Sequence, residues 1–165
     1  MPIPHDPSEY IKRVIEEIPN INSIILLYLE ESIRTYNIGA LFASSVMLGC
    51  ATEKAFLLLI ESYSNSLAES KRTEFINKTS GRPIKRQYDE FSKRLTTDLG
   101  TYPKEISENL ITILLGIFEI IRSTRNDSGH PTGKKVDKSS LFALLQIFIE
   151  YCKKIYQMIC YYEQR

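Results

Sequence analysis

The chain has 165 residues, which suits one folded domain with a hydrophobic core and leaves little room for a second. Hydrophobic residues make up 43% of it and charged residues 25%, which excludes a disordered chain, and seven glycines with seven prolines are too few for a loop-rich β-sandwich. The formal net charge of +1 excludes a protein that attracts polyanions as a whole, so any nucleic-acid surface requires local clusters of basic residues.

The N-terminal residues 1–7 contain three prolines and one of the two histidines, His5, and we predict a flexible tail there. They have neither the basic start nor the apolar run of a signal peptide. Asp6 or Ser8 is expected to cap a short helix from Glu9 to Glu17, which Pro19 ends.

Two further helices are expected before residue 67. Asn20 or Asn22 is positioned to cap the first of them, and residues 37–39 then form a bend or continue the helix. From Ala40 to about Ser66, apolar side chains cover more than one face, which is typical of a helix at the centre of a bundle. The uncharged stretch 35–52 includes several Ser, Thr and Asn residues, so we interpret it as core helix, not as a membrane span.

Residues 67–104 are predicted to form a polar, basic insertion, because this segment contains nine Lys or Arg residues and only five acids. A turn is expected at residues 79–83 and a modest helix from about Lys85 to Leu95. Tyr88 and Phe91 in that helix either stack on bases or pack the hairpin of this segment.

The basic side chains of this insertion are candidates for guiding an RNA backbone. A solvated helix face is the alternative interpretation. The residues we assign to RNA binding are Arg82, Lys85 and Arg86.

In the C-terminal third of the chain, apolar side chains again recur at helical spacing. Pro103 begins a helix whose apolar stripe runs to about Arg122, and residues 128–131 end it. Asp137 or Ser139 is expected to cap the last helix, whose tyrosines form a dimer contact or pack within the chain. Three cysteines without CxxC spacing are interpreted as buried thiols in a reducing cytosol, so we expect a cytoplasmic protein without cofactor or metal.

The candidate for chemistry is the polar segment Arg125-Asn126-Asp127-Ser128-Gly129-His130, at the end of a long apolar helix. An arginine binds phosphate bidentately, and a histidine transfers protons near neutral pH. Together they suit cleavage of an RNA phosphodiester by its own 2′-hydroxyl, with His130 moving the proton and Arg125 stabilising the phosphorane. This chemistry requires no metal. The two residues do not share a helical face, so a turn at Gly129 is expected to fold them together.

The residue types by themselves also allow a purely structural interpretation, in which Arg125 pairs with a nearby acid and His130 caps the helix. Glu53 lies in an otherwise apolar helix, and we hypothesise that it orients Arg125 or Arg122.

The segment from Arg125 to Pro131 resembles the signature of HEPN domains, which is an arginine, four to six residues and a histidine, often with Asn directly after the arginine. Arg125, Asn126 and His130 match this pattern. The resemblance covers roughly residues 20–160 in layout, with residue matches near the motif.

The resemblance implies one domain over residues 1–165, an all-α bundle of four to six helices with an up-and-down core. It implies a homodimer with a composite cleft, and metal-independent RNA cleavage that leaves 2′,3′-cyclic phosphate and 5′-hydroxyl ends. Arg125, Asn126 and His130 would be catalytic, with Glu53, Arg122 and Asp127 in support.

Members of that family often act as toxins or in phage defence, which would add an antitoxin or sensor partner. One branch has a tyrosine two residues after the histidine, a target of adenylylation, where this chain has Thr132. The alternatives are a non-catalytic HEPN module that binds RNA or nucleotide, and a helical-bundle interaction protein.

Overall fold

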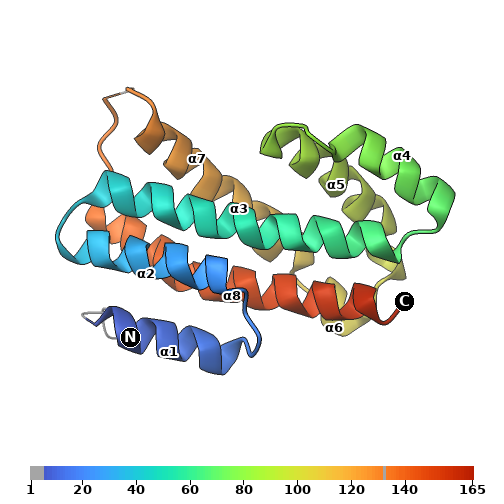
Figure 1. Cartoon of the computed structure of the whole chain (residues 1–165), viewed down its shortest axis with the longest axis horizontal. Coiled ribbons are helices and arrows are strands. Elements are labelled where there is room, and N and C mark those ends of the chain that lie inside the picture. Colours follow the sequence, from blue (N-terminus) through green and yellow to red (C-terminus); the bar gives the residue numbers. More distant parts are fainter. Residues whose placement is uncertain (1–5, 132) are drawn as a thin grey trace.

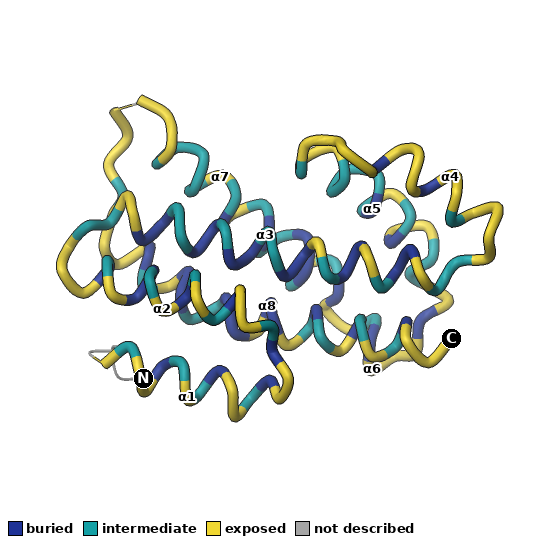
Figure 2. The backbone as a smooth tube through the Cα atoms, viewed as in Figure 1, coloured by how far each residue is buried: buried dark blue, intermediate teal, exposed yellow. Residues whose placement is uncertain are grey.

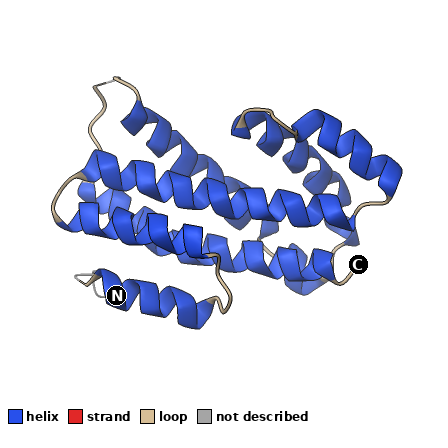
Figure 3. Ribbon diagram, viewed as in Figure 1, coloured by secondary structure: helices blue, strands red, loops and turns tan. Residues whose placement is uncertain are grey.

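The computed structural model describes residues 6–131 and 133–165, and all regular structure in them is helical (Figures 1 and 3). The predicted all-α class is therefore confirmed. The α-helices are α1 (Pro7–Glu17), α2 (Ser23–Asn37), α3 (Leu41–Ser66), α4 (Glu69–Thr79), α5 (Ile84–Asp98), α6 (Lys104–Ser107), α7 (Ile117–Gly129) and α8 (Lys138–Glu163). A 3₁₀ turn, Leu99–Thr101, follows α5, and a π-helical segment, Ile111–Gly116, leads into α7.

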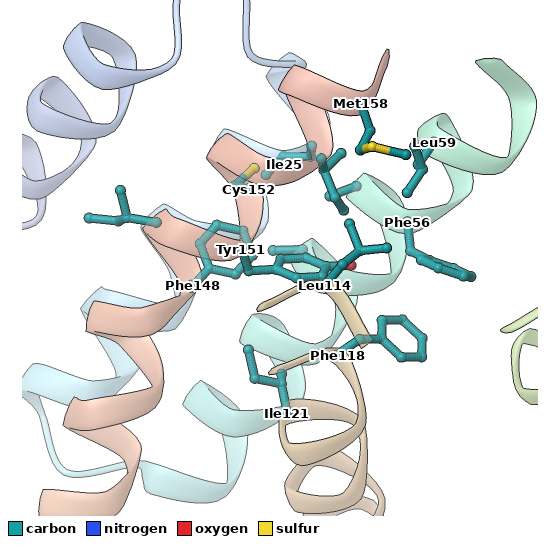
Figure 4. Close-up of a cluster of buried hydrophobic side chains, with 14 of the residues drawn as sticks. Ile25, Phe56, Leu59, Leu114, Phe118, Ile121, Phe148, Tyr151, Cys152 and Met158 are labelled. Atoms are coloured by element: carbon teal, nitrogen blue, oxygen red, sulfur yellow. The ribbon is translucent and has the colours of Figure 1, made fainter. Parts of the chain in front are cut away.

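Helix α3 is the centre of the bundle, packed against α2, α7 and α8 (Figure 1). Its buried side chains include Phe56, whose ring centroid lies 4.6 Å from that of Phe118 on α7. Tyr151 on α8 is buried beside them and donates its hydroxyl hydrogen to the Thr52 carbonyl at 3.1 Å (Figure 4). These contacts fix α7 and α8 against α3, and α3 and α7 are the helices that carry the candidate site.

Helix α3 is also long and apolar enough, by length and composition, to cross a membrane. In the fold, 56% of its most apolar stretch is buried inside the protein. Apolar neighbours surround both a central bundle helix and a membrane span on most sides, so the two kinds of helix have similar compositions.

Polar side chains cap the helix starts that the sequence predicted. Asn22 accepts a hydrogen bond from the Ile24 amide at 2.9 Å, and Asp137 accepts one from the Ser140 amide at 2.7 Å. Asp6 caps α1, so this helix begins at Pro7, two residues earlier than expected. The tail predicted over residues 1–7 is therefore wrong for Pro7, which is helical, and residues 1–5, with His5, lie outside the described residues.

The bend alternative is correct for residues 37–39, since Gly39 has a φ of +79° between α2 and α3. The helix expected to start at Pro103 is not continuous, because Asn109 adopts a φ of 54° after the single turn of α6. These interruptions, together with α4 in the basic insertion, raise the number of α-helices in the described residues to eight, above the predicted four to six.

Helix α4 was not predicted because its sequence is polar on nearly all sides. It is anchored by Phe75, which is fully buried and meets the Tyr63 ring edge-on at 5.1 Å. In α5, Phe91 is also buried and Tyr88 stacks on Phe118 at 4.8 Å, so both pack the insertion against the bundle. Of the two interpretations for these rings, packing is the one the fold supports.

The C-terminal tyrosines likewise make contacts within the chain. The hydroxyl of Tyr162 lies 2.7 Å from that of Tyr102, and Tyr156 accepts a hydrogen bond from the Asn22 amide at 2.7 Å. Packing within one chain therefore accounts for these rings.

We predict that Phe118→Ala lowers the free energy of unfolding by about 3–5 kcal/mol, because it leaves a cavity between α3, α5 and α7. Phe42→Ala is the matched control, since that ring is 50% exposed and its loss should change stability by about 0.5 kcal/mol or less. Urea unfolding followed by circular dichroism measures both, and equal losses in the two variants would contradict the packing described.

Candidate functional site

The predicted motif lies at the C-terminal end of α7, where the helix leaves the core for the loop to α8 (Figure 2). Arg125 to Gly129 are helical, and the His130 amide donates to the Asn126 carbonyl at 3.1 Å. The expected fold-back at Gly129 is wrong, because this glycine continues the α-helix. Five helical steps rotate a side chain by about 140°, so Arg125 and His130 leave the helix in different directions.

Arg125 lies against α3. A methyl carbon built on Gly49 would be 2.6 Å from the Arg125 Cβ and closer still to its Cγ, which is a steric overlap. The arginine methylenes therefore cross α3 at a position where only glycine fits. His130, by contrast, is exposed, and no hydrogen bond joins its side chain to Arg125 within the described chain.

The guanidinium of Arg125 has two nearby acceptors. Its Nη1 donates to Asn126 Oδ1 at 3.1 Å, and its Nη2 lies 3.8 Å from Glu53 Oε2. The side chains of Arg125 and Glu53 are 35% and 18% exposed, so the pair is partly shielded and partly open to solvent. The structure thus places Glu53 beside Arg125, one of the two partners hypothesised for it.

The second carboxylate oxygen of Glu53 is buried and has no hydrogen-bond partner in the described chain. Such an orphaned acceptor costs free energy unless a nearby charge compensates it. The Arg125 guanidinium is the charge positioned to do so.

Cys50 lies next to Glu53 and Arg125 in the same contact. Burial raises the pKa of its thiol, and the positive charge of Arg125 opposes that effect only in part. A thiol with a raised pKa is a poor nucleophile at neutral pH, so Cys50 serves here as a packing residue.

Arg122, the other candidate partner of Glu53, is held elsewhere. Its guanidinium donates to both oxygens of Glu119, at 2.6 Å and 3.2 Å. Lys85 of α5 approaches the same carboxylate at 3.8 Å. These bonds hold the pKa of Glu119 below its ordinary value, chiefly through the Arg122 hydrogen bond.

Asp127 points to the loop that follows α7, where its carboxylate receives a hydrogen bond from Lys134 at 2.9 Å. The supporting role assigned to Asp127 stays a prediction. Thr132, the position of the tyrosine in one HEPN branch, lies outside the described residues.

The three residues assigned to RNA binding lie at the turn between α4 and α5 and at the start of α5. Arg82 and Arg86 are exposed. Lys85 is bound to Asp89 at 3.0 Å as well as to Glu119, so its charge is largely compensated.

Residues 6–131 and 133–165 contain no cluster of three or more His, Cys, Asp or Glu side chains that could hold a metal ion.

Sequence reasoning did not connect Gly49 with Arg125, and it missed Glu119. Gly49 had one available signal, because a glycine inside a helix costs about 1 kcal/mol relative to alanine and therefore indicates a packing reason. Glu119 had the weaker signal of a carboxylate three residues before Arg122.

Comparisons of the chain with protein-family models, with curated proteins and with solved structures found no match. The likeness to HEPN domains therefore stays a prediction that depends on the motif and on the helical layout.

We predict that Arg122→Met raises the pKa of Glu119 toward its ordinary value, because the first cause of its lowering is the Arg122 hydrogen bond. A carboxylate with a lowered folded-state pKa stabilises the protein above its unfolded pKa, and this contribution disappears as the pH falls through the folded value. Carboxyl ¹³C NMR titration measures the shift. Arg34→Met, on α2, is the control and should leave Glu119 unchanged, whereas equal titration of Glu119 in all three proteins would refute the pairing.

Proposed function

We propose that this protein is a HEPN-type endoribonuclease that cleaves RNA without a metal ion and works as a homodimer. The observation that carries the proposal is an arginine, fixed across α3 but partly open to solvent, five residues before an exposed histidine at a helix end. If the end of α7 needed only a capping group, Arg125 would not have to pack against Gly49 of α3.

The chemistry assigned to each residue follows from its groups. Arg125 keeps its charge at any working pH and offers five N–H donors, of which the Asn126 and Glu53 contacts use only some. The others would bind the non-bridging oxygens of the phosphodiester and stabilise the phosphorane. His130 would take the proton of the 2′-hydroxyl or give one to the leaving 5′-oxygen, and Asn126 would hold Arg125 in place.

A second copy of the chain supplies what one chain lacks. Within one chain, Arg125 turns toward α3 and His130 lies exposed after the last turn of α7. His130 must lie within about 3 Å of the RNA oxygen whose proton it moves, while Arg125 must contact the same phosphate, so a composite cleft would use Arg125 of one copy with His130 of the other. This arrangement agrees with the dimer that the HEPN resemblance implies.

The biological setting we propose is a toxin or phage-defence nuclease in the cytoplasm, controlled by an antitoxin or sensor partner. Arg82 and Arg86 would guide the RNA backbone toward the cleft, with less contribution from Lys85 because two carboxylates compensate its charge.

A non-catalytic HEPN module that binds RNA or nucleotide is the second candidate. The separation of Arg125 from His130 within one chain is the observation that favours it, because phosphate binding needs the arginine alone.

We expect the purified protein to cleave total RNA in the presence of EDTA and to leave 2′,3′-cyclic phosphate ends. His130→Ala and Arg125→Ala should each lose at least about 100-fold in rate, the scale of a lost general acid–base or charge-stabilising group. Arg13→Ala on α1 is the control. Cleavage by His130→Ala at the rate of the unmodified protein would disprove the assigned chemistry, and RNA binding without cleavage would favour the second candidate.

The Arg82→Ala/Arg86→Ala double variant should bind single-stranded RNA with a weaker salt dependence. Each lost phosphate contact lowers the slope of log K against log salt by about 0.7 for a single strand. Fluorescence anisotropy at several salt concentrations measures it, beside a Lys12→Ala/Arg13→Ala control on α1. An unchanged slope would assign Arg82 and Arg86 to a solvated face.

A further inference from the structure

The surroundings of Arg125 on α3 contain two features that ordinary bundle packing does not explain. One is a glycine in the middle of a long apolar helix, and the other is a carboxylate with a buried, unpartnered oxygen. Gly49 and Glu53 are four residues apart, so they lie on the same face of α3, one turn above the other.

Gly49 determines how closely Arg125 can approach. Its missing side chain leaves space for the first two methylene carbons of Arg125, which a Cβ would overlap. The contrast with Gly116 is informative, because a Cβ there would meet no atom within 4 Å. Only the glycine under Arg125 is required by its surroundings.

Glu53 determines where the end of the same side chain lies. At 3.8 Å from Nη2, its carboxylate attracts the guanidinium without the short bidentate bond that would occupy both nitrogens. Asn126 Oδ1 holds Nη1 from the other side. The guanidinium is thereby restrained on α3 while keeping donors for a ligand.

We propose that Gly49 and Glu53 are positioning residues that hold Arg125 for phosphate binding, Gly49 by permitting the crossing and Glu53 by restraining the guanidinium. This inference rests on the proposed nuclease function. It assigns a role in RNA cleavage to α3, although the Arg125–His130 motif lies on α7.

Two variants test the proposal through activity. Gly49→Ala should displace Arg125 and lower kcat by about 100-fold, the cost of misplacing a catalytic group by about 1 Å. Glu53→Gln keeps the shape of the side chain, and it should lower kcat with little change in KM, because RNA is still bound elsewhere. Gly116→Ala is the matched control and should cleave RNA at the unmodified rate.

A second measurement does not depend on any activity. The Nε–H signal of Arg125 in ¹⁵N NMR should differ from those of exposed arginines, and Gly49→Ala and Glu53→Gln should move it toward them. A double-mutant cycle of Gly49→Ala with Arg125→Gly, followed by urea unfolding, should show coupling, because the alanine overlaps only with the arginine side chain.

The outcomes separate this proposal from the nuclease function. If RNA is not cleaved by the unmodified protein, the nuclease proposal fails, and the NMR signal alone decides whether Arg125 is positioned as described. If Arg125→Ala abolishes cleavage while Gly49→Ala and Glu53→Gln cleave normally, the positioning roles are overturned and the nuclease stands. Absence of both the coupling and the NMR shift would also overturn them.

Discussion

The crossing of Arg125 over Gly49 is the contact on which the candidate site depends. It sets how closely α3 and α7 approach near the C-terminal end of α7, and it packs the arginine methylenes against α3 while leaving the side chain partly accessible. A glycine in a helix interior is costly, and a partly buried carboxylate is costly as well. The free-energy costs of Gly49 and of Glu53 are explained if both residues position Arg125.

The charged residues around this crossing form two separate groups. Glu53, Arg125 and Asn126 lie at the α3–α7 contact. Glu119, Arg122 and Lys85 join α7 to α5 one to two turns earlier. The second group compensates its own charges, so it contributes to holding the basic insertion on the bundle. The first leaves arginine donors available, which is why we assign the chemistry there.

Much of the fold was predictable because local rules decide it. Asn22 and Asp137 cap helices where the sequence placed candidate caps, and the apolar run after Ala40 is central because nearly all its faces are apolar. Helix α4 was not predictable from period, since Phe75 is its one buried hydrophobic side chain in an otherwise polar sequence. The break at Asn109 depends on a single left-handed residue without a glycine or proline to signal it.

The site was predictable only in part for a similar reason. The motif placed Arg125 and His130 at a helix end, which is where they lie, but the turn expected at Gly129 is absent because the helix continues through it. Glu53 was identified as the unusual acid in an apolar stretch. The pairing of Gly49 with Arg125 was not predicted, because the contact of two helices far apart in sequence cannot be read from either one alone.

Arg125 and His130 leave α7 in different directions within one chain, and the proposed dimer brings them together only between two copies. Mixing the Arg125→Ala and His130→Ala chains by co-refolding tests this most directly, since only a mixed dimer restores an intact arginine facing an intact histidine. The account predicts that the mixture recovers RNA cleavage that neither variant shows alone. A mixture as inactive as its two components, under conditions where the unmodified protein cleaves RNA, would contradict it.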